Sequence, residues 1–186
     1  MSQGKGIFLT KKLEDIAPDQ RCVIQRYISK PYLIDGLKFD LRLYVLIAGV
    51  DPLRIYLYHE GLARFATESY VVPNKDNIED VCMHLTNYAI NKESDKFIFN
   101  EDENDMSVGH KRSITSVFKL MEENGVDIEQ LKKKIHQMIV KTMISGLSHL
   151  KFQYRSCQLD NFRSDMCFEI LGFDVILNEE LEPFLL

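Results

Sequence analysis

Three charged side chains stand at every second position of one short segment, at Lys38, Asp40 and Arg42. Alternation of charged and apolar residues is typical of a half-buried β-strand, whose side chains face opposite sides in turn. The three charges therefore share one face and follow one another at about 7 Å. A cation, an anion and a cation in one row can hold a polyanion such as a nucleoside triphosphate with its metal, although the segment alone equally fits an ordinary solvated strand face. The alternating apolar positions are Leu37, Phe39, Leu41, Leu43 and Val45.

Five further sequence blocks accompany this segment, and none of them is specific when taken singly. They are Gln3-Gly4-Lys5-Gly6-Ile7, Gln25-Arg26-Tyr27-Ile28-Ser29-Lys30-Pro31, Glu60-Gly61-Leu62-Ala63-Arg64-Phe65-Ala66, His84-Leu85-Thr86-Asn87-Tyr88-Ala89-Ile90 and Phe168-Glu169-Ile170-Leu171-Gly172-Phe173-Asp174-Val175. In this order and spacing the six blocks resemble the tubulin tyrosine ligase-like family, and within it the polyglutamylating members. The resemblance covers nearly the whole chain and implies a fold of ATP-grasp type, in which a nucleotide lies between two α+β lobes.

The chemistry that the resemblance implies is ATP-dependent amide ligation. A carboxylate on a tubulin tail is first phosphorylated, and the amine of free L-glutamate then attacks the acylphosphate, so that glutamate is added to glutamate side chains. ATP and Mg²⁺ are the implied cofactors, and tubulin, or the microtubule, is the implied partner. Two alternatives remain: a glycylase of the same family, and a non-catalytic fragment that binds nucleotide or microtubules.

Nucleotide binding is the first role that the resemblance assigns. The backbone of Tyr27 and Ile28 would read the edge of adenine, and one of these two side chains would cover its face. The ammonium of Lys38 would reach the triphosphate, Asp40 would contact the ribose or a phosphate-bound metal, and Arg42 would bind phosphate or brace Asp40. The full set of expected nucleotide-binding residues is Gln3, Gly4, Gln25, Arg26, Tyr27, Ile28, Lys38, Asp40, Thr86 and Asn87.

A pocket for the incoming amino acid is the second implied feature. Arg64, Tyr88 and Lys111 match the family positions for glutamate, and an arginine can hold a carboxylate with two parallel hydrogen bonds. His110 stands where the family usually has serine, and a surface lysine at the start of a helix is the alternative for Lys111. His84 is interpreted as a packed, hydrogen-bonded core residue rather than a catalyst.

Asp174 matches the first magnesium ligand of the family and follows an apolar run at residues 168–173. Together with Lys38 and Arg64 it completes the expected catalytic set. The resemblance places two further metal ligands after a stretch like Pro183-Phe184-Leu185-Leu186, and a whole lobe before the glycine-rich block. We therefore expect a fragment clipped at both ends, which by itself would be a poor or inactive ligase.

The secondary structure expected from the pattern is α+β, with an antiparallel sheet and packed helices in one partial ATP-grasp domain spanning residues 1–186. Gly125 is expected to end the first of two helices and Asp127 to cap the second. Strands are predicted at residues 7–9, 22–28, 39–48, 53–58, 62–66, 167–177 and 182–186, a long loop at 91–107, and helices at 110–124 and from 127 onward.

Composition sets limits on the class of protein. The hydrophobic share of 45% and the charged share of 27% are ordinary for a globular domain. A formal charge of −5 argues against a nucleic-acid partner, and the apolar runs are too short to span a bilayer. The four cysteines form no CxxC pair and are interpreted as reduced thiols. We expect a cytoplasmic monomer at the cytoskeleton, with the cilium or basal body as its more specific location.

Overall fold

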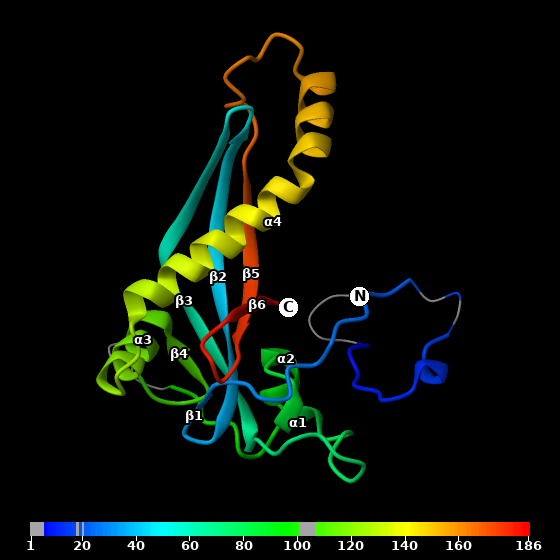
Figure 1. The fold of residues 1–186 in the computed structure, drawn as a ribbon, viewed down its shortest axis with the longest axis vertical. Coiled ribbons are helices and arrows are strands. Elements are labelled where there is room, and N and C mark those ends of the chain that lie inside the picture. Colours follow the sequence, from blue (N-terminus) through cyan, green and yellow to red (C-terminus); the bar gives the residue numbers. More distant parts are fainter. Residues whose placement is uncertain (1–5, 18, 20, 101–106) are drawn as a thin grey trace.

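A six-stranded antiparallel sheet organises the described part of the chain, for which the computed structural model covers residues 6–17, 19, 21–100 and 107–186. The strands are β1 (Leu33–Ile34), β2 (Leu37–Val50), β3 (Leu53–Ser69), β4 (Lys111–Ser113), β5 (Glu169–Leu177) and β6 (Pro183–Leu185). Across the sheet their order is β4, β3, β2, β5, β6, and β1 pairs with β2 outside this path. The long β2–β3 hairpin and β5 run side by side through the molecule (Figure 1).

Two helices, α3 (Ile114–Glu123) and α4 (Ile128–Cys157), cover one face of this sheet, and α4 crosses the central strands diagonally (Figure 1). Each begins at a side-chain cap: the backbone N–H of Ser116 donates to the side chain of Ser113 at 3.0 Å, and that of Gln130 donates to Asp127 at 2.9 Å. The shorter helices are η1 (Leu13–Asp15), α1 (Val81–His84) and α2 (Tyr88–Asn91).

The hydrophobic core lies between the sheet and the pair α3 and α4. Period-two alternation along β2 turns one set of side chains toward the helices, where they are buried with Ile135 of α4 and Met121 of α3. The charged positions between them consequently face the other side of the sheet. The buried set from β2 is Phe39, Leu41, Leu43, Val45 and Ile47.

Most of the predicted elements form. The α+β class, the central strand, the capped helix from Asp127 and the closing antiparallel pair β5–β6 are confirmed. Residues 53–58 and 62–66 were predicted as two strands but belong to one, β3. Gly61 allows this continuity, because a Cβ there would lie 2.5 Å from the carbonyl oxygen of Arg42 and from the side chain of Ile114.

Two predicted strands do not form, and two predicted boundaries are shifted. The strands at residues 7–9 and 22–28 do not form, and Val23 and Ile24 are 92% and 66% exposed, so their strand propensity is not matched by a burying partner. The helix predicted from residue 110 begins at Ile114, because residues 111–113 pair with β3 as β4. The predicted loop at 91–107 begins one residue later, after Asn91 ends α2, and residues 101–106 lie outside the described part.

Among the residues described, every helix is too short or too polar to cross a lipid bilayer.

Candidate functional site

Two arginines and two aspartates meet on the sheet face opposite the core. The register of β2 sets Asp40 opposite Arg64 of β3 and Arg42 opposite Asp174 of β5, and side chains directly opposite on one face are within reach of each other. Arg64 Nε donates to Asp40 Oδ1 at 2.9 Å, while its Nη2 contacts the other oxygen of Asp40 and lies 3.0 Å from Asp174 Oδ2. Arg42 Nη2 donates to Asp174 Oδ2 at 2.8 Å. These four residues form a charge-balanced ion cluster.

Burial separates the two carboxylates of the ion cluster. Asp40 has no exposed surface, and this burial raises its pKa even though Arg64 works in the opposite direction. Burial alone would also raise the pKa of Asp174, but hydrogen bonds from Arg42 and the charges of Arg42 and Arg64 lower it. Asp174 therefore remains an anion at neutral pH, on the side of the ion cluster that is open to solvent.

Lys38 lies on the same strand face but points toward a different set of groups. Its Nζ donates to the carbonyl oxygen of His84 at 2.6 Å and to the hydroxyl of Tyr27 at 3.1 Å, and it lies 4.2 Å from the centroid of the Tyr27 ring. The side chain is buried, which lowers the pKa of Lys38 to about 8 against a partial opposing effect of Asp40. Because of this lowered pKa, Lys38 loses its proton at a lower pH than an ordinary lysine does.

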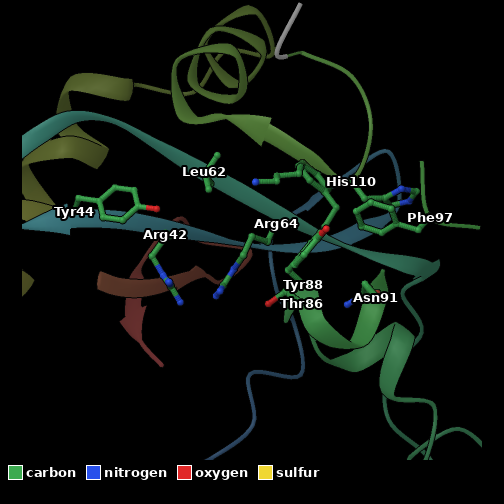
Figure 2. A pocket seen from close by; sticks show the side chains of 11 residues that line it. Arg42, Tyr44, Leu62, Arg64, Thr86, Tyr88, Asn91, Phe97 and His110 are labelled. Carbon is green, nitrogen blue, oxygen red and sulfur yellow. The ribbon is translucent and has the colours of Figure 1, made fainter. Parts of the chain in front are cut away.

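A pocket of about 190 Å³ opens beside the ion cluster (Figure 2). The three residues predicted to contact the amino acid, Arg64, Tyr88 and Lys111, all line it, and the Nζ of Lys111 lies 5.7 Å from the Tyr88 ring centroid. Arg42 and Thr86 join them, whereas Lys38 is not among the lining residues. Among the described residues, the lining consists of Arg42, Tyr44, Leu62, Arg64, Phe65, Thr86, Tyr88, Asn91, Phe97, His110 and Lys111.

Asn91 fixes the short helix that carries Tyr88. Its Oδ1 accepts hydrogen bonds from the backbone and the hydroxyl of Thr67, at 2.9 and 3.1 Å, and its Nδ2 donates to the carbonyl oxygen of Leu85 at 2.7 Å. Asn91 is 1% exposed, so these bonds form away from water. They hold α2 against β3 and thereby set the distance between Tyr88 and Arg64.

An aromatic wall completes the pocket on the side of β4. The ring of His110 packs 5.4 Å from that of Phe97, and its Nδ1 accepts the backbone N–H of Ile98 at 2.9 Å. Burial lowers the pKa of His110, which favours the neutral ring. Figure 2 shows His110 and Phe97 together at one end of the pocket, with Arg42 and Arg64 extending from the sheet in the same direction.

The remaining predicted nucleotide residues lie along the outer segments. Gln25 and Arg26 are exposed, and Gln25 Nε2 donates to the carbonyl oxygen of Leu185 in β6 at 2.5 Å. Ile28 is half-buried, and Asn87 begins α2 with its carbonyl oxygen accepting from Ile90 at 3.1 Å. The last two predicted residues, Gln3 and Gly4, lie outside the described residues.

The described residues fit a nucleotide better than they fit a metal. Lysine, arginine and threonine donors around the ion cluster suit phosphate oxygens. Within the described ranges, no group of three or more histidine, cysteine, aspartate or glutamate side chains could hold a metal ion together. Asp174 by itself supplies one carboxylate, which is fewer than the oxygen ligands that Mg²⁺ usually takes from protein and substrate combined.

Comparison with known proteins decides the family. The sequence model described as "Tubulin-tyrosine ligase family" matches residues 1–186. The chain belongs to the tubulin-tyrosine ligase family. This confirms the resemblance found in the six sequence blocks, and the antiparallel α+β architecture is consistent with part of the fold of that family.

Relatives within the tubulin-tyrosine ligase family carry names of one activity. The chain is 61% identical over 184 residues to a probable beta-tubulin polyglutamylase of Tetrahymena thermophila, covering 99% of this chain and 15% of that protein. It is 47% identical over 184 residues to tubulin polyglutamylase TTLL6 of Mus musculus, covering 99% and 22% respectively. It is 40% identical over 187 residues to tubulin polyglutamylase TTLL7 of Mus musculus, covering 100% and 20%. The chain thus spans roughly a fifth of the length of these relatives.

Sequence reasoning missed several residues of the pocket, for two different reasons. Leu62 and Tyr44 share a strand face with Arg64 and Arg42, so the period-two pattern could have found them. Asn91 and Phe97 carry no local signal, because tertiary contacts alone bring them to the pocket. The interpretation of His84 as a packed residue agrees with its complete burial and with hydrogen bonds at both ring nitrogens.

Proposed function

We propose that this chain forms part of the active site of a tubulin polyglutamylase, a ligase that uses ATP and Mg²⁺ to add L-glutamate to glutamate side chains of tubulin. One observation carries the proposal: Arg64, Tyr88 and Lys111 line one pocket directly beside the ion cluster. A ligase of this kind needs an amino-acid site and a phosphate site in contact. Arg64 lines the pocket and is also part of the ion cluster. The names of the relatives support tubulin as the partner.

The nucleotide is proposed to bind along the row of Lys38, Asp40 and Arg42, with Thr86 and Asn87 contributing polar contacts. When bound, ATP supplies the phosphoryl group that activates the acceptor carboxylate. Arg42 and Arg64 offer guanidinium groups whose charge Asp40 and Asp174 balance in the absence of ligand. A phosphate arriving here competes with Asp174 for arginine donors, and Asp174 is then the group proposed to bind Mg²⁺. Mg²⁺ needs further oxygen ligands beyond those that the described residues supply.

The amino-acid pocket supports glutamate over glycine. Nε and Nη2 of Arg64 are engaged in the ion cluster, so the N–H groups on Nη1 remain to bind a ligand. Lys111 adds a second cation, and the Tyr88 ring lies close to it. Two cations match the two carboxylates of glutamate, whereas glycine carries one. The aromatic wall of Phe97 and His110 packs around the methylene groups of the longer side chain.

The surroundings of the reaction follow from this assignment. The partner is proposed to be tubulin in the microtubule, the second substrate is free L-glutamate, and the protein acts as a monomer in the cytoplasm at the cytoskeleton, including the cilium or basal body. The net charge of −5 means that an acidic tubulin tail must approach a local basic surface rather than the molecule as a whole.

A chimaeric ligase tests this proposal. In it, residues 1–186 of this chain replace the matching segment of the Tetrahymena relative, with which they share 61% identity. The purified chimaera is incubated with microtubules, ATP, Mg²⁺ and labelled amino acids, glutamate and glycine in parallel. We expect ATP-dependent incorporation of glutamate. Incorporation of glycine instead would make the protein a glycylase, and nucleotide or microtubule binding without incorporation would make this segment a non-catalytic binding module.

A further inference from the structure

A partly buried chain of hydrogen bonds reaches from Asn77 to the ammonium of Lys38. The carbonyl oxygen of Asn77 lies 2.9 Å from His84 Nε2, and His84 Nδ1 lies 2.9 Å from the hydroxyl of Tyr27. Lys38 Nζ donates to this hydroxyl at 3.1 Å and to the carbonyl oxygen of His84 at 2.6 Å. The side chain of His84 is completely buried. Packing in the core does not by itself account for these contacts, because they end on the ammonium of Lys38, which is proposed to bind a nucleotide.

The chemistry of the partners fixes the direction of each hydrogen bond. A carbonyl oxygen accepts only, so the proton of the neutral His84 ring is on Nε2 and points to Asn77. Nδ1 then accepts the Tyr27 hydroxyl proton, for which the Tyr70 hydroxyl is a second neighbouring acceptor, and the hydroxyl oxygen of Tyr27 accepts from Lys38. Burial lowers the pKa of His84, and the charge of Lys38 lowers it further against the opposing effects of Asn77 and Asp80. The ring is therefore neutral and every donor in the chain has an acceptor.

We propose that Tyr27 and His84 are positioning residues, which fix the ammonium of Lys38 for the phosphates of a bound nucleotide. The inference rests on the proposed nucleotide site. A lysine side chain loses much rotational freedom when its ammonium is ordered, and here two oxygens and the Tyr27 ring impose that order before a ligand binds. Two of the three ammonium donors are engaged by these oxygens, so the third can reach a phosphate oxygen.

This role changes the assignment of Tyr27. Its ring lies under the ammonium of Lys38 and edge-on to the ring of His84, with ring centroids 5.6 Å apart. A ring held in this way is already covered on one side, so the hydrophobic surface for adenine is assigned to Ile28 of the same segment. Tyr27 then acts on the phosphate end of the nucleotide although it belongs to the segment expected to read the base.

Binding of ATP and of adenosine by the chimaeric ligase tests the proposal, with dissociation constants measured by calorimetry. Tyr27→Phe removes the hydroxyl and keeps the ring. His84→Gln keeps an amide donor near the place of Nε2 and loses the acceptor at Nδ1, whereas His84→Asn keeps an acceptor near the place of Nδ1. We expect Tyr27→Phe and His84→Gln to weaken ATP binding about tenfold and to leave adenosine within about twofold, with His84→Asn closer to the unsubstituted protein.

Two controls separate positioning from folding. Tyr154→Phe removes another tyrosine hydroxyl, which accepts the backbone N–H of Met166 at 3.2 Å far from Lys38, and should leave both affinities unchanged. In the double variant Lys38→Met with Tyr27→Phe, ATP should bind no more weakly than to Lys38→Met alone, because the hydroxyl acts only through the ammonium. If His84→Gln does not fold, Tyr27→Phe carries the test, since it deletes a single atom.

The outcomes distinguish the inference from the function on which it rests. Equal losses for ATP and adenosine, or additive losses in the double variant, would overturn the positioning role. Unchanged ATP affinity in both Tyr27→Phe and His84→Gln would overturn it as well. An unsubstituted chimaera that does not bind ATP would instead contradict the proposed function.

Discussion

Arg64 contacts two carboxylates from two different strands, and its loss affects stability as well as ligand binding. Removing the whole side chain leaves Asp40 buried without its partner, an effect that commonly costs about 3–5 kcal/mol of folding free energy. Arg64→Lys is the better test of function, because it keeps a cation near Asp40 and loses the planar guanidinium that can bind a carboxylate through two hydrogen bonds.

We predict that Arg64→Lys in the chimaeric ligase lowers glutamate incorporation by about tenfold or more, with ATP affinity reduced by less than about threefold. Arg64→Ala should abolish incorporation, and its unfolding midpoint must be measured beside its kinetics. Initial rates against glutamate and calorimetric titration with ATP give the two quantities. If ATP affinity falls in parallel with ligation in Arg64→Lys, Arg64 is a phosphate-binding residue and the division of the site is wrong.

Lys38→Ala should weaken ATP binding by about 2 kcal/mol, since the ammonium is proposed to contact phosphate and charged contacts of this kind are strong. Lys30, an exposed lysine paired with Glu179, offers a matched control in Lys30→Ala. Titration calorimetry of both variants measures the difference. Near-normal ATP affinity in Lys38→Ala would remove Lys38 from the nucleotide site.

The lowered pKa of Lys38, about 8, predicts a pH dependence of nucleotide binding. Below this value the side chain is a cation that attracts phosphate, and above it the free protein carries a neutral amine. Contact with phosphate favours the charged form of Lys38. ATP binding at about pH 8 to 9 should therefore be accompanied by uptake of a proton, and it should weaken as the pH rises. Calorimetry in buffers of different ionisation enthalpy measures this uptake, which should be absent in Lys38→Met. Equal uptake in both proteins would contradict the assignment.

For strands and helices, sequence patterns predicted where each element lies in the chain better than they predicted which residues pair between strands. Period two in residues 39–48 identified β2 and the face that carries its charges, and the caps at Gly125 and Asp127 set the helix boundary. The pairing of Asp40 with Arg64, rather than with Arg42 of its own strand, depends on the register of β2 against β3. Register is a property of the assembled sheet and cannot be read from either strand alone.

The failures at element scale have physical causes of the same kind. Residues 22–28 have apolar and β-branched side chains, yet they form no strand, because strand propensity takes effect only with a partner and a surface to bury. Residues 53–58 and 62–66 were predicted as separate strands, but they form one, β3. Gly61, between them, permits the close approach of β2 and α3 to this continuous strand.

The N-terminal cap of α4 gives a prediction about stability. Asp127→Ala should lower the free energy of unfolding by about 1 kcal/mol, because the backbone N–H of Gln130 loses its acceptor. Glu129→Ala, in the same exposed turn, is the control and should cost less than half as much. Urea unfolding of both variants provides the measurement. Equal effects of the two substitutions would show that charge in the first turn, and not the cap, stabilises the helix.

At the scale of the whole molecule, the sheet separates two tasks. One face lies under α3 and α4 (Figure 1). The opposite face carries the ion cluster and the pocket. Packing on the first face fixes the strand register that builds the site on the second. A substitution in the core can thus disturb the site through the sheet, so activity losses need to be compared with stability before they are attributed to chemistry.

The assignment of the pocket beside the ion cluster to glutamate depends above all on Lys111. Lys92 and Lys111 lie at nearly equal distances from the Tyr88 ring, 5.8 and 5.7 Å, but only Lys111 lines the pocket. The measurement is the KM of the chimaeric ligase for glutamate in Lys111→Met and in Lys92→Met. We predict that Lys111→Met raises this KM about tenfold with the KM for ATP unchanged, and that Lys92→Met changes neither. Equal effects of the two substitutions, or a rise in the KM for ATP alone, would contradict the assignment of this pocket to glutamate.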